Sequence, residues 1–308
     1  MKRIPVIMDC DPGHDDAIGI ILACASDKLD VKGITTVGGN QTIEKTTNNA
    51  LRVLRFIDKD IPVAKGANMP IRRELEIAPS VHGDSGLDGP VLPEPIKEPL
   101  DISAVELMAQ ILEESHEKVT LVPTGPLTNI AIFLLAYPHL KAKIERISLM
   151  GGAAIGGNWT AAAEFNILVD PEAADIVFKS GIPITMAGLD VTHRAKVYPE
   201  DIARIKAQGG KVAIMVGELL EFFIRFHRDI CGWDFAPLHD PCAVAWLINP
   251  DMFTSKKLHV MIDTNGEHTT GCTVTDFYGS TAPNVDVLLD VDRYQFVDLL
   301  VEAVNKYN

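Results

Sequence analysis

The sequence contains few cysteines and no long apolar run. Its five cysteines include no Cys-x-x-Cys pair, which excludes the usual zinc-binding patterns and a disulfide framework and favours a reducing compartment. No apolar run reaches the roughly 18 residues that a membrane-spanning helix needs. Met1-Lys2-Arg3 leads directly into a short expected strand, without the apolar segment of a secretory signal. We therefore expect a cytoplasmic protein.

Positive charge is also scarce. Lysine and arginine number 28 against 42 aspartate and glutamate residues, so the formal net charge is −14 at pH 7. A surface this negative repels phosphate backbones and anionic lipids, so neither a nucleic-acid polymer nor a membrane is expected as a partner. Apolar residues make up 47% of the 308 residues, which is enough for a large core. No linker or repeat marks a boundary, so residues 1–308 are predicted to form a single domain.

Short apolar runs alternate with amphipathic stretches through most of the chain. This alternation predicts an α/β fold with an open, doubly wound, mainly parallel sheet and helices on both faces. Extra helices and strands are expected in the C-terminal third, and the proline-rich residues 68–100 are expected to form a long functional loop. The expected strands are Ile4–Met8, Val31–Val37, Lys118–Val122, Arg146–Met150, Pro183–Ala187, Leu258–Ile262, Thr270–Phe277 and Val285–Asp290. The expected helices are Asp15–Ala25, Thr42–Ile57, Ile102–Glu114, Pro126–Ala136, Pro171–Ser180, Pro199–Ala207, Lys211–Arg228, one starting at Pro241, and Arg293–Asn305.

Polar residues follow nearly every expected strand. Asp9 to Asp16 follow the first strand, Gly38-Gly39-Asn40 follow the second, and Thr124 lies just beyond the third. In open α/β sheets, ligands bind where the strands deliver their carboxyl ends. The sequence therefore predicts a site at this edge of the sheet.

Acidic residues crowd the first of these strand ends. Asp15 or Asp16 can be explained as a cap of the following helix, whose amino end favours carboxylates. Capping does not require Asp11 as well, and three carboxylates around one turn repel one another unless a cation is present. Oxygen ligands without cysteine or clustered histidine point to a hard cation, Ca²⁺ or Mg²⁺. Thr124 can contribute its backbone carbonyl, or it can simply cap the helix expected from Pro126.

A second acidic element is His239-Asp240-Pro241. Asp-Pro is a common helix start, with aspartate as the cap and proline at the first helical position, so Asp240 can be a plain cap. The neighbouring histidine supports another interpretation, in which the pair supplies a metal ligand and a proton donor together.

Taken together, these motifs resemble the nucleoside hydrolase family in order and spacing over nearly the whole chain. The segment 81–90 and the stretch around Trp159 look most like the bacterial pyrimidine-preferring members of that family. The motifs that carry the resemblance are Asp9-Cys10-Asp11-Pro12-Gly13-His14-Asp15-Asp16, Val37-Gly38-Gly39-Asn40, His82-Gly83, Thr124-Gly125-Pro126, Asn158 to Asn166 and His239-Asp240-Pro241.

The resemblance implies hydrolysis of the N-glycosidic bond of ribonucleosides, with uridine and cytidine as the leading substrates and Ca²⁺ as the cofactor. It implies a homo-oligomer, either a dimer or a tetramer. The implied calcium ligands are Asp11, Asp16, Asp240 and the carbonyl of Thr124, and Asp11 is also the implied base that takes the proton of the attacking water. The implied sugar contacts are Asp15, Asn40, Met150, Asn158, Glu164 and Asn166.

Residues that meet the base are less well defined. His82 and His239 are candidates for protonating the departing base, although His82 can also be a solvated loop histidine. Phe165 is expected near the base, and the edge from His227 to Trp233 is expected to act as a mobile lid. Some pyrimidine-preferring members carry glutamine and tyrosine on this lid, where the chain has His227 and Cys231. This departure leaves a purine-preferring or broad-specificity enzyme as an alternative.

Two other classes of function remain open from the sequence. Asp9-x-Asp11 after a strand is also typical of phosphatases with an aspartate nucleophile, but the lysine and hydroxyl that those enzymes need at later strand ends cannot be identified. A nucleoside-binding protein on the same scaffold is the non-enzyme alternative, and the complete acidic set argues against it.

Overall fold

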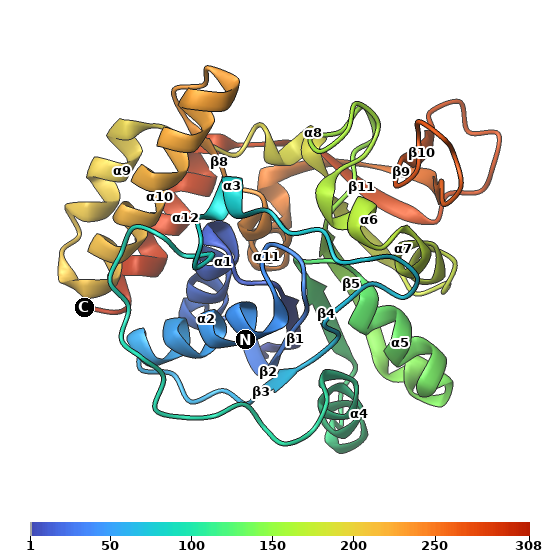
Figure 1. Cartoon of the computed structure of the whole chain (residues 1–308), viewed down its shortest axis with the longest axis horizontal. Helices are drawn as coiled ribbons and strands as arrows, with labels where there is room; N and C mark the ends of the chain where they lie inside the picture. Colours follow the sequence, from blue (N-terminus) through green and yellow to red (C-terminus); the bar gives the residue numbers. More distant parts are fainter. Residues whose placement is uncertain (1) are drawn as a thin grey trace.

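A nine-stranded sheet forms the centre of the computed structural model, which describes residues 2–308 (Figure 1). Its order is β10-β9-β11-β6-β5-β4-β1-β2-β3. Neighbours from β3 to β11 are parallel, whereas β9 runs antiparallel to β11 and β10. This arrangement confirms the predicted open, mainly parallel sheet. The strands are β1 (Ile4–Cys10), β2 (Leu29–Thr36), β3 (Val63–Lys65), β4 (Val119–Pro123), β5 (Ile144–Met150), β6 (Ile184–Ala187), β9 (Phe253–Ile262), β10 (Thr273–Asp276) and β11 (Val285–Val291), with a separate pair, β7 (Lys196–Val197) and β8 (Ala236–Pro237).

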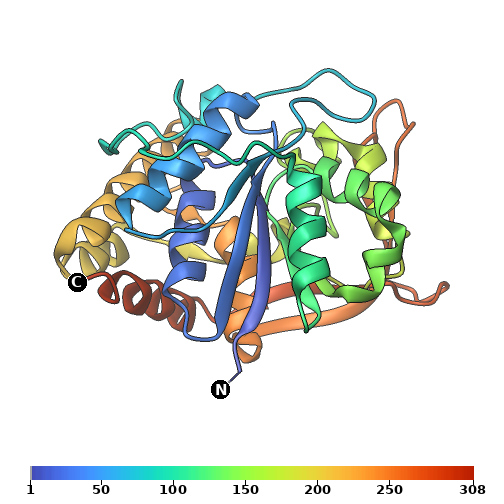
Figure 2. The same cartoon turned by 90° about the horizontal axis from the view of Figure 1, so that it is seen from below.

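Helices cover both faces of the sheet, which Figure 2 shows nearly edge-on. Alternate residues of a strand point to opposite faces. Val6 and Met8 accordingly join the core beneath α1, α10 and α11, whereas Ile7 joins the core beneath α4, α5 and α7. The α-helices are α1 (His14–Ala25), α2 (Ile43–Phe56), α3 (Pro79–His82), α4 (Ala104–Glu114), α5 (Thr128–Ala136), α6 (Phe165–Val169), α7 (Pro171–Phe178), α8 (Leu189–Thr192), α9 (Pro199–Lys206), α10 (Gly210–Cys231), α11 (Asp240–Ile248) and α12 (Arg293–Asn305), and two 3₁₀ turns cover Pro138–Lys143 and Pro250–Met252.

The predicted long elements are present with ends that shift by a few residues. The short elements β3, α6, α8 and the β7–β8 pair were not predicted, because segments of two to five residues carry too little periodicity. The expected long loop from residue 68 to residue 100 carries one short helix, α3. Within residues 2–308, no helix combines the length and apolarity needed to cross a membrane.

The strand order places a switch point beside β1. From β1 the chain adds β2 and β3 on one side, and it then returns to add β4 on the other side. The segments that follow β1 and β4 therefore diverge at the carboxyl edge of the sheet, which leaves a crevice of the kind that binds ligands. Residues 11–16 and Thr124 leave the sheet at this crevice.

Candidate active site

The turn between β1 and α1 presents buried carboxylates. Asp15 and Asp16 occupy the first turn of α1, where free N–H groups and the helix dipole favour negative charge. The Asp16 carboxylate accepts hydrogen bonds from the Gly13 backbone N–H (3.0 Å) and from the Thr124 hydroxyl (2.8 Å). Asp16 thereby joins the ends of β1 and β4 across the switch point.

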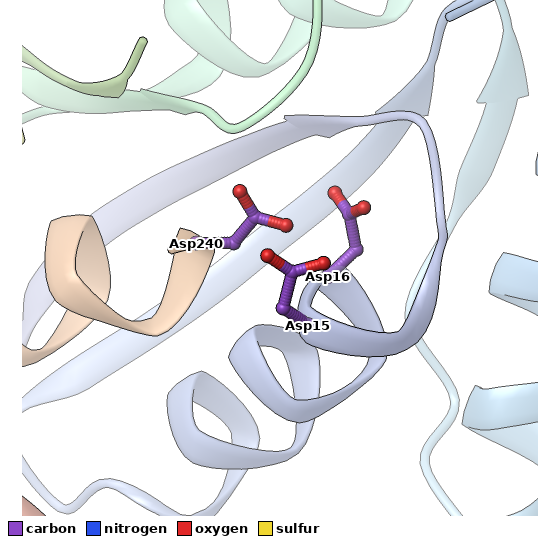
Figure 3. A group of neighbouring side chains, drawn as sticks. All are labelled: Asp15, Asp16 and Asp240. Atoms are coloured by element: carbon purple, nitrogen blue, oxygen red, sulfur yellow. The ribbon is translucent and has the colours of Figure 1, made fainter. Parts of the chain in front are cut away.

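Asp240 reaches the same place from the opposite end of the sequence. Figure 3 shows its carboxylate, at the start of α11, facing those of Asp15 and Asp16 at the start of α1. One oxygen from each of the three carboxylates lies within 4.8 Å of the others, and all three residues are buried. Helix α11 starts at Asp240 with His239 as its capping residue. The alternative interpretation of Asp240 as the helix cap is therefore wrong.

Asp11 lies beside this group with one oxygen free. Its Oδ2 accepts a hydrogen bond from the Asn40 backbone N–H (2.6 Å), whereas its buried Oδ1 has no hydrogen-bond partner within residues 2–308. A Cβ atom at Gly39 or Gly125 would collide with this carboxylate, so only glycine fits at both positions. The two Gly-containing motifs that follow β2 and β4 thus serve to make room for Asp11.

These carboxyl groups are costly to keep charged without a counter-ion. Burial, followed by the charge of Asp16, raises the pKa of Asp11 well above its usual range and the pKa of Asp15 to about 7. Burial, followed by the charges of Asp15 and Asp16, likewise raises the pKa of Asp240. A bound cation would remove this cost, and the unpartnered Oδ1 of Asp11 offers it a ligand atom. A set made only of oxygen donors fits a hard divalent cation.

Metal-free protein should become more heat-stable as the pH falls from about 8 to about 7. Raised carboxyl pKa values stabilise the fold at low pH, and this stability is lost as the pH rises through about 7, the raised pKa of Asp9 and Asp15. Buried histidines act oppositely mainly below this window, because the unfolded chain protonates its histidines near pH 6.5, whereas burial lowers the pKa of His14 and His227 to about 4. Melting temperatures measured after chelation check the sign. A flat or falling melting temperature across this window would contradict the cost assigned to the carboxylates.

Amide and carboxylate side chains line the side of the crevice next to the acidic cluster. Glu164 caps α6, and its carboxylate accepts hydrogen bonds from the backbone N–H groups of Asn166 (3.0 Å) and Gly152 (2.8 Å). The Asn166 side-chain amide donates to the carbonyls of Thr124 (2.8 Å) and Met150 (3.3 Å). These contacts fix the ends of β4 and β5 relative to α6.

These groups open into one pocket of about 510 Å³, a size typical of small-molecule sites. Of the predicted site residues, Asp15, Asn40, His82, Thr124, Met150, Asn158, Glu164, Phe165, Asn166, His227, His239 and Asp240 line it. Asp11 and Asp16 lie buried next to the lining residues Asn40 and Thr124. The long segment 68–100 contributes to the pocket through α3, as expected of a functional loop.

Aromatic and imidazole rings form the opposite side of the pocket. The rings of His227 and Trp233 are stacked, with centroids 5.8 Å apart, and His193 packs edge-on against Trp233 and His239. His82 is only 5% exposed, so the alternative of a solvated loop histidine is wrong. Burial lowers the pKa of His82 and His239 well below 6.5, so both imidazoles are neutral at pH 7.

His193, one of the lining residues, was not predicted from the sequence. His193 follows β6 by way of the four-residue helix α8, and its only signal was that Gly188-Leu189-Asp190 come at a strand end. Phe223 and Phe226 of α10 also line the pocket, and their apolar spacing in the sequence is equally typical of core packing.

Known proteins resemble this chain over nearly its full length. The profile of the family described as "Inosine-uridine preferring nucleoside hydrolase" matches residues 6–298. The pyrimidine-specific ribonucleoside hydrolase RihA of Photobacterium profundum is 60% identical over 307 residues, covering 98% of this chain and 99% of the relative. RihA of Escherichia coli K12 is 57% identical over 309 residues, covering 99% of each chain. Among solved structures, a purine-preferring ribonucleoside hydrolase from Gardnerella vaginalis superposes with a TM-score of 0.92 at 31% identity, covering 98% of each chain.

Proposed function

Because this chain belongs to the inosine-uridine preferring nucleoside hydrolase family, we propose that it hydrolyses the N-glycosidic bond of ribonucleosides to ribose and free base. One observation carries the proposal. A single pocket joins a buried acidic cluster, a row of amide and carboxylate side chains, and a wall of aromatic and imidazole rings. These three surfaces match the water, the sugar and the base of a nucleoside. Because the chain belongs to this family, the alternative of a phosphatase with an aspartate nucleophile is no longer supported.

Uridine and cytidine are the proposed substrates. The relatives at 60% and 57% identity are named pyrimidine-specific, whereas the purine-preferring structure is only 31% identical. His227 and Cys231, which replace the glutamine and tyrosine expected on the lid, keep purine nucleosides as the alternative. Steady-state kinetics on uridine, cytidine, inosine and adenosine test the preference. Higher kcat/KM for inosine than for uridine would reverse it.

The proposed cofactor is Ca²⁺, held by Asp11, Asp16, Asp240 and the Thr124 carbonyl. The family depends on a metal, and the buried acidic cluster of this chain supports such a site. When bound, the cation supplies Lewis acidity that lowers the pKa of water and orients the ribose. Asp15 lies within the same cluster as Asp16 and Asp240, which supports a contact with a ribose hydroxyl beside the ion.

In the proposed mechanism, Asp11 is the general base. Its Oδ1 has no hydrogen-bond partner within residues 2–308, while the Asn40 backbone N–H holds Oδ2. Oδ1 would therefore keep one lone pair to accept the proton of a water molecule even if the other contacted the cation. The water oxygen bonds to the anomeric carbon as the bond to the base nitrogen breaks. Carboxylates of Asp15 and Glu164 favour the positive charge that develops on the sugar.

The departing base takes the electron pair of the broken bond and meets the imidazole side of the pocket. We assign His82 and His239 as the residues that contact it. Both are neutral at pH 7, and a neutral imidazole can stabilise a developing negative charge by donating a hydrogen bond. Phe165, His227 and Trp233 would pack against the ring of the base.

Uridine 5′-monophosphate should be a much poorer substrate than uridine. Within residues 2–308, no lysine or arginine lines the pocket, and Glu164 faces the sugar side. A desolvated phosphate without a positive partner costs several kcal/mol, so kcat/KM should fall by about 100-fold or more. Equal kcat/KM for the two compounds would count heavily against this assignment of the sugar contacts.

A nucleoside-binding protein without activity is the remaining alternative, and an assay for reducing sugar released from uridine decides between the two. Assembly and location stay predictions. Light scattering coupled to gel filtration tests the expected dimer or tetramer, and cell fractionation tests the expected cytoplasmic location.

A further inference from the structure

We propose that His14 is a positioning residue that holds His82 against the base side of the pocket. This inference rests on the proposed function, and it assigns a role to a side chain that the mechanism above does not use. His14 is fully buried in the first turn of α1, between the residues of the acidic cluster, and it does not line the pocket. Its partners lie 68 and 74 residues further along the chain.

Two hydrogen bonds and a close ring contact join His14 to the segment that carries His82. The backbone N–H of His14 donates to Nδ1 of His82 (3.3 Å), and the Nδ1 atoms of the two rings lie 3.2 Å apart. Nε2 of His14 lies 2.8 Å from the carbonyl of Asp88. Asp88 in turn donates its backbone N–H to the His82 carbonyl (3.5 Å). His14 therefore contacts both ends of the turn from His82 to Asp88.

The Asp88 carbonyl next to Nε2 of His14, and the His14 backbone N–H next to Nδ1 of His82, favour one protonation pattern for the two rings. A carbonyl can only accept, so Nε2 of His14 carries a proton, and a backbone N–H can only donate, so Nδ1 of His82 accepts. A neutral His82 then carries its proton on Nε2. That nitrogen has no hydrogen-bond partner within residues 2–308, and His82 lines the pocket. The backbone N–H of His14 thus leaves the Nε2–H of His82 available as a donor to the base. In this pattern the two Nδ1 atoms both carry lone pairs and form no hydrogen bond, so the His14 side chain holds the segment through Asp88 and through ring packing.

Packing around the two rings allows little other movement. A Cβ atom at Gly13 would lie 2.6 Å from Nδ1 of His82, so the close approach of this ring depends on glycine. On the other side, the Phe222 ring of α10 stacks on His14 with centroids 4.6 Å apart and an interplanar angle of 10°. The His82 ring stacks on Phe223 at 5.8 Å. The turn that carries the acidic cluster and the histidine that faces the base are consequently built as one unit.

Leaving-group dependence separates positioning of His82 from general damage to the site. Uracil is a poor leaving group and depends on a donor, whereas 4-nitrophenolate departs without one. We expect His14→Ala to lower kcat on uridine by about 10- to 100-fold, which is part of the loss typically seen when a proton donor is removed. The same variant should change kcat on 4-nitrophenyl β-D-ribofuranoside by less than about 3-fold. His82→Ala should show the same selectivity, and the double variant should be no slower on uridine than His82→Ala alone.

Two conservative variants refine the test. His14→Gln keeps a donor near the position of Nε2, toward the Asp88 carbonyl, and should recover part of the uridine activity that His14→Ala loses. His14→Asn keeps only a polar atom near the position of Nδ1, next to His82, and should recover less. Calcium-loaded melting temperatures, measured for every variant, identify any that fail to fold, and the folded variants carry the test.

The inference is overturned if a folded His14 variant loses activity on both substrates equally, or if the effects of His14→Ala and His82→Ala multiply in the double variant. If instead the proposed function is wrong, the unaltered protein will release no sugar from either substrate, which distinguishes this outcome from failure of the inference about His14.

Discussion

Replacing Asp11 by asparagine should lower kcat on uridine by about 1000-fold or more, the loss expected when a general base that also binds the cation is removed. The Oδ1 atom of Asp11, beside the acidic cluster, is buried and has no hydrogen-bond partner within residues 2–308. An asparagine can still accept the hydrogen bond from the Asn40 backbone N–H, but it can take no proton from water. Measurement of kcat with saturating calcium isolates the chemical role from weakened ion binding.

The fold of this variant should survive. Burial and the neighbouring Asp16 raise the pKa of Asp11, so its negative charge at pH 7 costs stability in metal-free protein, and a neutral amide removes that cost. The metal-free melting temperature should therefore not fall. Asp201→Asn is the matched control, because Asp201 is also buried but pairs with Arg293, and neither residue lines the pocket. This control should lose stability and keep kcat. Near-normal kcat in Asp11→Asn would remove Asp11 from the role of base.

Chelation of divalent cations should abolish turnover of uridine, and added calcium should restore it. The loss should also reach about 1000-fold, since a bound cation contributes several kcal/mol to such a reaction. Without a cation, the carboxylates of Asp15, Asp16 and Asp240 also repel one another, because their oxygens lie within 4.8 Å of one another. Circular dichroism after chelation should show an intact fold, because the cores on both faces of the sheet do not involve the cluster.

Recovery with magnesium but not with calcium would reject calcium as the cofactor while keeping a hard cation. Full turnover after exhaustive chelation, verified by elemental analysis, would contradict any catalytic role of a metal in this pocket.

Much of the fold followed from local pattern. Alternation of apolar runs predicted the parallel sheet, and the closing helix Arg293–Asn305 has the predicted bounds because its amphipathic spacing is regular and Asp292 caps it. The convergence of Asp11 to Asp16 with Thr124 was predictable for a different reason, since parallel strands deliver their ends to one edge. The sequence around Asp240 allowed both a helix cap and, with His239 beside it, a metal ligand, and the family resemblance favoured the ligand.

Contacts between segments that are distant in the sequence could not be predicted, because they leave no local pattern. Nothing in the sequence near His14 indicates that it meets His82, 68 residues away, because a contact between a helix start and a loop leaves no periodic pattern. The need for glycine at Gly39 and Gly125 follows from the position of Asp11, which only three-dimensional packing defines. His193 was missed for the same reason, since its neighbours Trp233 and His239 lie on other segments.

Calorimetric titration of metal-free protein with calcium tests most directly whether aspartates from both ends of the chain hold one ion. We predict one calcium bound per chain in the unaltered protein, and binding weakened by at least about 100-fold in Asp16→Asn and in Asp240→Asn, since each loses a buried charged ligand. Undiminished calcium binding in both variants, or no binding in the unaltered protein, would contradict the account.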